Sequence, residues 1–168
     1  MTTTTFDPAS IALIEEHVRR LLVIMDFEAA TVHCRLLPLT EEAQVAQAQL
    51  HISIEAGDDG KRLIGVQGIH LDALQHLVRS LLRRQLQSTV YVILDVNGYR
   101  ARRERTLLQL AEATAARAHH TGRTIVLKPM AAADRRVLHT ALAARGDVST
   151  ESMGDEPNRR VVVRPVFL

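Results

Sequence analysis

The sequence contains few of the residues from which disulfides, cysteine-rich metal sites and aromatic clusters are built. Its 168 residues include one cysteine, two tyrosines, three phenylalanines and no tryptophan. The single cysteine, Cys34, cannot form an internal disulfide, and alone it cannot supply a sulfur-rich zinc site. We therefore expect Cys34 to be a small core residue.

Long apolar runs and a secretion signal are also missing. No run approaches the roughly 20 apolar residues that cross a bilayer. Residues 1–6 are mostly threonine and lack the charged-then-apolar pattern of a signal peptide. Hydrophobic residues make up 46% of the chain and charged residues 24%, as in ordinary globular proteins, which argues against disorder. We expect a folded cytoplasmic protein without membrane insertion.

The sequence shows no motif for catalysis or metal binding. Catalysis needs a nucleophile with a base, a carboxylate pair or a metal cluster. His119 and His120 are adjacent, so their side chains diverge on a helix and do not share a metal. We expect no enzymatic activity, no metal and no cofactor. The scarcity of aromatic residues also argues against an RRM module, whose strands carry a stacking pair.

The charge is distributed unevenly along the chain. Residues 1–60 carry three basic and ten acidic residues, a net charge of −7, whereas residues 61–168 carry a net charge of +9. Nineteen of the 21 basic residues are arginine, whose planar guanidinium suits phosphate binding. A GC-rich genome would give the same bias, so both explanations stay open.

Periodicity predicts an α+β protein with two modules, residues 8–97 and 98–168. The first module is predicted to run helix, two strands, two helices, strand, and the second helix, strand, helix, two strands. Asp7 is the expected cap of the first helix, and residues 89–96 are expected to form a strand buried on both faces or nearly so. The first module's elements are predicted near residues 8–25, 31–37, 48–54, 61–64, 71–88 and 89–96, and the second's near 99–119, 124–127, 131–144, 147–152 and 159–166.

The tetrapeptide Gly65-Val66-Gln67-Gly68 stands at the entrance to the leucine-rich helix, whose apolar positions include Leu77 and Leu81. Paired glycines let a backbone approach a ligand without Cβ interference, and the helix start supplies N–H groups and a positive dipole end. Together they form a clamp for the phosphates of a single strand, the device of the KH fold. A plain turn is the alternative, but the flanking order of helices and strands favours the clamp.

A second candidate lies on the helix predicted at residues 131–144. Arg135 and His139 are four residues apart, so both are expected on one exposed ridge, with Arg136 beside them. A cation and an imidazole placed in this way can share a phosphate. Spacing alone favours a solvated helix face over a binding site.

Longer stretches carry a family resemblance. Residues 62–75 and 94–100 resemble the KH module of bacterial Jag-type proteins, also called KhpB-like. Residues 127–130, 134–139 and 149–163 are similar to the R-three-H domain, named for an Arg-x-x-x-His signature that Arg135 and His139 match here.

The resemblance implies a type II KH module followed by an R-three-H module, in a cytoplasmic protein that binds single-stranded RNA. Members of this family act in post-transcriptional control, cell shape and division, and some pair with a second small KH protein. Many also carry an N-terminal Jag domain, which we expect this chain to lack.

The sequence departs from the family pattern in the glycine loop. The variable pair is usually basic, whereas here it is Val66-Gln67, so Lys61 and Arg62 one helical turn earlier are expected to compensate. Arg102 and Arg103 stand at the start of the long helix, where cations oppose the helix dipole and so gain nothing from helix stability. A phosphate-facing role and a merely solvated helix face both stay open for them.

We therefore expect single-stranded nucleic-acid binding, with RNA favoured over single-stranded DNA, by a post-transcriptional regulator or RNA chaperone. Contacts to phosphates alone do not distinguish the two nucleic acids. The alternative is a protein-interaction adaptor whose KH module mediates dimerisation, with itself or with a second small KH protein. The expected nucleic-acid-binding residues are Gly65, Val66, Gln67, Gly68, Lys61, Arg62, Arg135, Arg136, His139, Lys128, Arg102 and Arg103.

Overall fold

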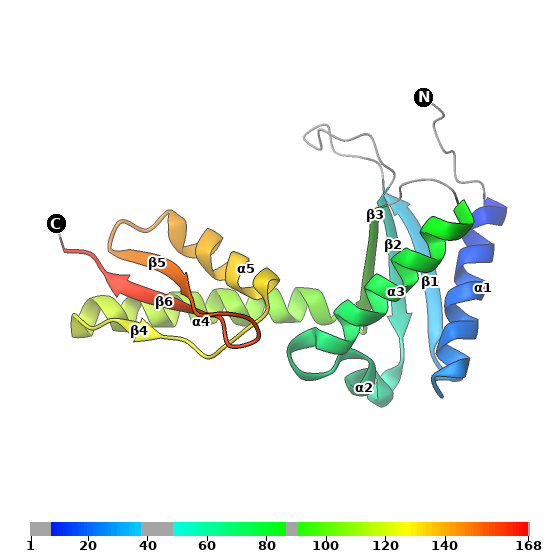
Figure 1. The fold of residues 1–168 in the computed structure, drawn as a ribbon, viewed down its shortest axis with the longest axis horizontal. Helices are drawn as coiled ribbons and strands as arrows, with labels where there is room; N and C mark the ends of the chain where they lie inside the picture. The colour runs from blue at the N-terminus through cyan, green and yellow to red at the C-terminus, as the bar shows by residue number, and fades with distance from the viewer. Residues whose placement is uncertain (1–7, 38–48, 87–90, 168) are drawn as a thin grey trace, which may run out of the picture. The chain divides into compact units, whose positions relative to one another are not determined.

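The computed structural model describes residues 8–37, 49–86 and 91–167. The chain divides into two compact units, Met1–Tyr99 and Arg100–Leu168. Each unit has its own three-stranded sheet and its own hydrophobic core (Figure 1). The expected cap Asp7, the expected strand start at residue 48 and the first two residues of the strand predicted at 89–96 lie outside the described residues.

The first unit has the predicted order of helix, two strands, two helices and strand. Its sheet has the order β1-β2-β3, with β1 antiparallel and β3 parallel to the central β2. This α+β arrangement confirms the expected KH-like fold. The elements are α1 (Pro8–Ile24), β1 (Thr31–Leu37), β2 (Gln49–Glu55), α2 (Gly60–Ile64), α3 (Ile69–Leu86) and β3 (Tyr91–Val96), with 3-10 turns η1 (Gly57–Asp59) and η2 (Val66–Gly68).

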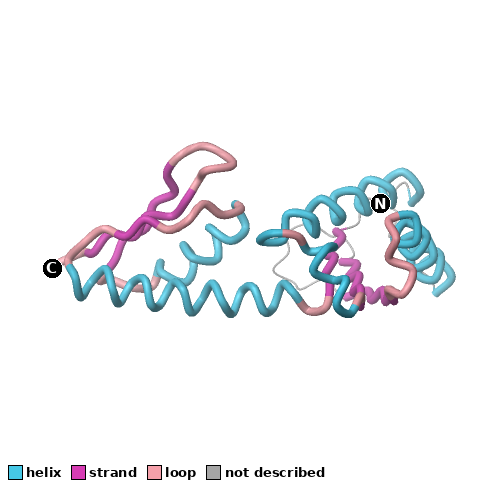
Figure 2. Tube along the Cα trace, turned by 90° about the horizontal axis from the view of Figure 1, so that it is seen from below, coloured by secondary structure: helices cyan, strands magenta, loops and turns pink. Residues whose placement is uncertain are grey.

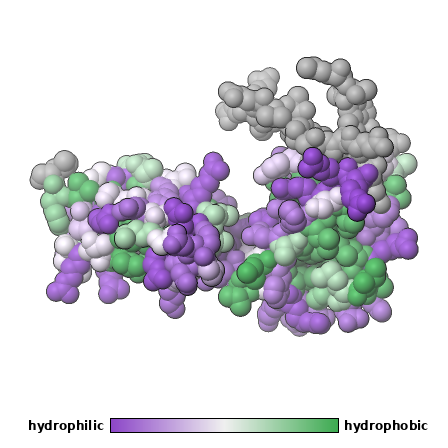
Figure 3. Space-filling model, viewed as in Figure 1, coloured by the Kyte–Doolittle hydropathy of each residue, from purple (hydrophilic) through white to green (hydrophobic). Residues whose placement is uncertain are grey.

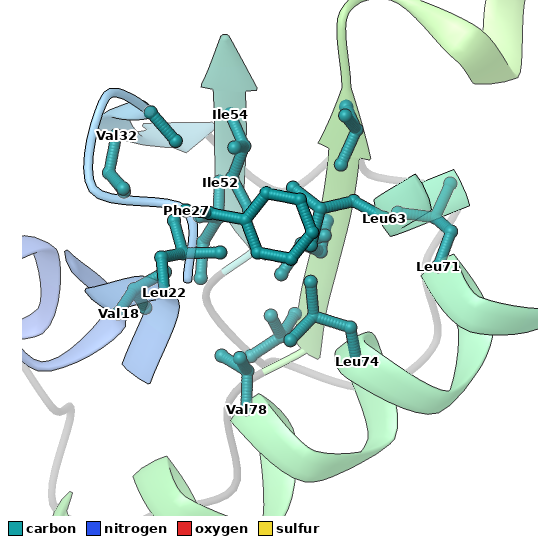
Figure 4. Close-up of a cluster of buried hydrophobic side chains, with 14 of the residues drawn as sticks. Val18, Leu22, Phe27, Val32, Ile52, Ile54, Leu63, Leu71, Leu74 and Val78 are labelled. Atoms are coloured by element: carbon teal, nitrogen blue, oxygen red, sulfur yellow. The ribbon is translucent and has the colours of Figure 1, made fainter. Parts of the chain in front are cut away.

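The core of the first unit lies between the sheet and its helices, which occupy one side of the strands (Figure 2). Strand residues alternate between the two faces of a sheet, and Leu50, Ile52 and Ile54 on β2 are buried on the helix side. Apolar side chains from α1, α2 and α3 meet them there (Figure 4). The labelled members of this cluster are Val18, Leu22, Phe27, Val32, Ile52, Ile54, Leu63, Leu71, Leu74 and Val78.

Strand β3 differs from its prediction. Val92 and Leu94 are buried, but Tyr91 is 52% exposed and Ile93 is only half-buried. The expectation of burial on both faces is wrong because, within the described residues, the helices pack against the other face of this sheet.

Cys34, on the helix side of β1, is a free thiol packed against this core. Burial, and secondarily the charge of Glu15, raises the pKa of Cys34 to about 12. The Cys34 backbone N–H donates a 2.6 Å hydrogen bond to a carboxylate oxygen of the same Glu15. The partly buried side chain packs against the core, as expected of a small core residue, and the raised pKa favours the protonated thiol.

The second unit also follows its predicted order, with an antiparallel sheet in the order β4-β6-β5. Small side chains on α4, among them Ala111, Ala115 and Ala118, are buried in its core, where they let the helix approach its neighbours closely. The elements are α4 (Tyr99–Thr121), β4 (Ile125–Val126), α5 (Ala132–Ala143), β5 (Val148–Met153) and β6 (Arg160–Pro165). Within the described ranges, no helix combines the length and apolarity that a membrane crossing requires.

Candidate nucleic-acid interface

The predicted glycine loop forms the connection from α2 to α3. Three of its residues have positive φ angles: Gly65 (+70°), Gln67 (+55°) and Gly68 (+86°). Val66 is 79% exposed and Gln67 is also exposed, so the loop presents both variable residues to solvent. The four predicted residues therefore lie together in one surface turn at the N-terminal end of α3.

Both glycines are required by contacts within the first unit. A Cβ on Gly65 would lie 2.5 Å from Cγ of the His70 ring, and one on Gly68 would lie 2.9 Å from Cε1 of Tyr99. His70 Nδ1 is in turn 2.8 Å from the carbonyl oxygen of Arg62, which fixes the ring beside the turn. The fold thus supplies its own reason for both glycines, and their contact with a ligand stays a prediction.

Asn97 fixes the start of α2 relative to the sheet. The Ala56 backbone N–H donates to Asn97 Oδ1 at 2.8 Å, and Asn97 Nδ2 donates to the Gly57 carbonyl at 2.7 Å. The Asn97 amide also lies so close to Gly60 that any Cβ there would collide with it. In the sequence, Asn97 is followed by glycine, a pair that predicts only a turn. The structure shows that Asn97 also positions the helix that leads into the glycine turn.

The two cations before the turn differ in their surroundings. Lys61 and Arg62 are both exposed on α2. The Arg62 guanidinium lies 4.9 Å from the centre of the Phe27 ring and 3.7 Å from a carboxylate oxygen of Asp59. Part of its charge is therefore already matched within the unit, and Lys61 is the stronger candidate to compensate for the uncharged loop.

Apolar residues adjoin the turn along α3. Helical spacing predicts Leu77 and Leu81 as core positions of this helix, but they are 43% and 41% exposed. They continue a line of positions four residues apart that begins at Ile69, which is 66% exposed. Hydrophobic surface is visible over the α2–α3 connection (Figure 3). The surface next to the glycine turn is thus apolar as well as basic.

Arg135 does not lie on an exposed ridge. The residue is only 6% exposed, and its Nη2 donates to the carboxylate of Glu156, which belongs to the turn between β5 and β6. Its Nε is buried without a hydrogen-bond partner among the described residues. The prediction of exposure is wrong because helical spacing on α5 reveals nothing of the hairpin turn that covers this side chain.

His139 faces the same hairpin. Its Nδ1 lies 2.7 Å from Thr150 Oγ1 and its Nε2 lies 2.8 Å from Ser152 Oγ, both on β5. Burial, and secondarily the charge of Arg135, lowers the pKa of His139 below its usual range. The ring is therefore mostly neutral at pH 7, so it is a hydrogen-bonding group rather than a second cation. Helix α5 does bring Arg135 and His139 to one side, as predicted, but that side packs against β5 and its turn.

Arg103 is also tied into the second unit. Its Nε and Nη2 donate to Asp134 Oδ2 at 3.1 and 2.6 Å, and Asp134 is 8% exposed. Asp134 stands in the first turn of α5, where a carboxylate is favoured by the helix dipole. A cation at the start of α4 gains nothing from the dipole of its own helix. Arg103 nevertheless stabilises the second unit, because its partner Asp134 lies on α5. Arg102 is exposed.

Two other predicted cations of the second unit stand at its surface. Arg136, next to Arg135 on α5, is exposed, and so is Lys128 in the connection from β4 to α5.

Among the described residues, no group of three or more His, Cys, Asp or Glu side chains is arranged to hold a metal ion. What the site offers chemically is hydrogen bonding and positive charge.

Comparison with known proteins identifies the domain family of the second unit. A model of the R-three-H domain matches residues 105–165, which include α5 and the β5–β6 hairpin. Fold and match together define a protein of two α+β units of which the second is an R-three-H domain.

Three relatives extend the similarity beyond that domain. The "RNA-binding protein KhpB" of Clostridium symbiosum is 35% identical over 125 residues, 74% of this chain and 56% of the relative. The protein of the same name from Streptococcus pneumoniae is 31% identical over 161 residues, 95% of this chain and 46% of the relative. That of Bacillus subtilis is 30% identical over 182 aligned residues, 95% of this chain and 86% of the relative.

The chain belongs to the KhpB family, as its sequence motifs predicted. It spans about half the length of the clostridial and streptococcal relatives and most of the Bacillus one. The names of these relatives describe binding proteins and not enzymes, in agreement with the expectation from the sequence.

Proposed function

We propose that this chain binds single-stranded nucleic acid through its phosphate backbone, and that the nucleic acid is RNA. The observation that carries the proposal is the turn Gly65–Gly68 at the start of α3, which exposes Val66 and Gln67 between its two glycines, with exposed Lys61 one helical turn before it. A helix N-terminus favours phosphate through its N–H groups and its partial positive charge. The names of the relatives support RNA as the ligand.

In the first unit, residues 8–97 act as the KH module. The α3 N-terminus and Lys61 contact phosphates, and Arg62 adds charge from the same helix. Val66 and Ile69 offer apolar surface on which an unpaired base can pack, since they are 79% and 66% exposed. An uncharged loop gives a weaker ionic contribution than the usual basic pair, so the apolar contact has a larger share here.

In the second unit, residues 98–168 act as the R-three-H module. Exposed Arg136, Lys128 and Arg102 attract the phosphates, while Arg135 and His139 hold the β5–β6 hairpin next to them. Phosphate contacts position a strand but carry no sequence information. We therefore propose low sequence specificity, as suits a cytoplasmic post-transcriptional regulator or RNA chaperone.

The test is a titration of the whole chain against three labelled ligands: single-stranded RNA, single-stranded DNA of the same sequence, and duplex RNA. We expect the single strands to bind more tightly than the duplex. For three phosphate contacts, affinity should fall roughly 20-fold between about 50 and 200 mM salt. Absence of binding at the lower salt concentration would overturn the proposal.

One observation favours the alternative, a protein-interaction adaptor whose KH module mediates dimerisation. The exposed line Ile69, Leu77 and Leu81 on α3 is a surface that a second copy, or another small KH protein, could cover. Such an interface is apolar, so its association should change little with salt. Sedimentation of the chain at the same two salt concentrations distinguishes it from RNA binding.

A further inference from the structure

The ion pair between Arg135 and Glu156 is uneven in its exposure. The Arg135 side chain is 8% exposed, whereas that of Glu156 is 57% exposed. Arg135 is anchored on α5, and Glu156 lies in the turn that joins β5 to β6, outside both strands. The carboxylate therefore covers the guanidinium from the solvent side, and of the two groups it is the one with room to move.

The pair also cancels the charge at the R-three-H signature. One guanidinium and one carboxylate sum to zero, and the His139 ring beside them adds little charge, because burial lowers its pKa. A phosphate approaching this point meets a carboxylate before it meets a cation. The exposed Arg136, the next residue along α5, is the nearest charge on that helix that an anion can reach directly.

The chemistry of the covered group suits a phosphate. A guanidinium binds carboxylate and phosphate with the same planar fork of N–H donors. Arg135 has donor capacity to spare, since its buried Nε has no partner within the described part of the chain. Glu156 is the exposed member of the pair, so its carboxylate can leave for water, and a phosphate that takes its place restores a charge-assisted bond to the buried Arg135 guanidinium.

We propose that Glu156 is an internal competitor for phosphate: its carboxylate occupies the position at Arg135 that a phosphate of the bound strand takes, and RNA engages Arg135 only when Glu156 leaves. This inference rests on the proposed RNA binding and adds a gate to it. Because a phosphate must first displace the Glu156 carboxylate, the second unit binds RNA less tightly than its basic residues alone would allow.

The test is Glu156→Gln, which removes the charge while its amide oxygen still accepts a hydrogen bond from Arg135. We expect single-stranded RNA to bind roughly 3- to 10-fold more tightly, with a salt dependence steeper by about 0.7 in log–log slope, the value for one added phosphate contact. The gain should disappear in the Arg135→Gln background.

The matched control is Asp155→Asn, which removes the same charge one residue earlier in the same turn and leaves the ion pair between Glu156 and Arg135 in place. We expect its effect to stay within twofold. Equal gains from Asp155→Asn and Glu156→Gln would show a general charge effect and overturn the gate. So would a gain that persists without Arg135.

A second measurement uses the natural chain and does not depend on the folding of Glu156→Gln. The Arg135 Nε–H resonance, assigned by its loss in Arg135→Gln, is followed while single-stranded RNA is added. A shift that saturates with binding supports the gate, and an unmoved resonance in an RNA-bound protein contradicts it. If neither the natural chain nor Glu156→Gln binds RNA, both the proposed function and the gate are wrong; binding without any effect of Glu156→Gln overturns the gate alone.

Discussion

The His70 ring occupies the space that a side chain on Gly65 would need, with its Cγ 2.5 Å from the position of a Cβ there. Gly65 also combines a φ of 70° with a ψ of −177°, a region that only glycine adopts readily. The first glycine of the candidate clamp is therefore determined by the fold before any ligand is considered.

Gly65→Ala should accordingly destabilise the protein by about 2–3 kcal/mol, from backbone strain together with the collision with His70. The matched control is Gly57→Ala, at a φ of +49° but with no described atom within 4 Å of its Cβ position, which should cost only about 1 kcal/mol. Urea unfolding measures both. Repeating Gly65→Ala in a His70→Ala background should recover part of the loss. Equal losses of unfolding free energy in Gly65→Ala and Gly57→Ala would contradict this account of the turn.

Substitutions at Arg103 and Arg136 should have different effects: the first should lower stability, and the second should weaken RNA binding. Arg103→Gln breaks the bond to buried Asp134 and should cost about 1–2 kcal/mol, with RNA affinity changed less than about twofold. Arg136→Gln removes an exposed cation, so it should leave the melting temperature within experimental error and reduce the salt slope of binding by about 0.7. Thermal melts of the two variants measure the change in stability, and salt titrations of their RNA binding measure the change in affinity and in salt slope. The reverse pattern would show that Arg103 is the phosphate contact.

His139 should make stability depend on pH. Its pKa is lowered in the folded state, so folding favours the neutral ring. Its contribution is fully present above the unfolded pKa of about 6.5 and is lost as the pH falls from there toward the lowered folded value. His139→Gln lacks this titration, so the stability difference between the natural chain and the variant should shrink between about pH 8 and pH 5. A difference that is constant with pH would show that the ring does not titrate in this way.

Replacing both signature residues should affect more than binding. The sequence alone predicts that Arg135→Ala with His139→Ala weakens RNA binding and leaves the fold intact. Because the structure ties both side chains to the β5–β6 hairpin, we expect the double variant to lose about 2–4 kcal/mol of stability as well. Chemical unfolding of the double variant decides between the two expectations.

The order of elements could be predicted because each has a strong local signal. Alternation on β2 and helical spacing on α3 identified strand and helix, and asparagine and glycine marked the turn after β3. Local signals do not tell which apolar positions stay uncovered. Helical spacing therefore predicts Leu77 and Leu81 as core residues, although both side chains are exposed.

The site was predicted less well than the fold because its contacts join residues far apart in sequence. Glu156 and Asp134 lie 21 and 31 positions from the arginines that they neutralise. Nothing in the spacing of Arg135 and His139 indicates that a hairpin turn covers them. The glycine turn was found because its residues are contiguous, whereas its supports His70, Tyr99 and Asn97 became visible only in three dimensions.

The most direct measurement is the mapping of backbone amide shifts in the isotope-labelled full chain while single-stranded RNA is added. The account predicts the largest shifts at Gly65–Gly68 and Lys61 in the first unit, and around Arg136 and the turn that carries Glu156 in the second. Shifts confined to the apolar line Ile69, Leu77 and Leu81, or no saturable shifts at either site, would contradict it.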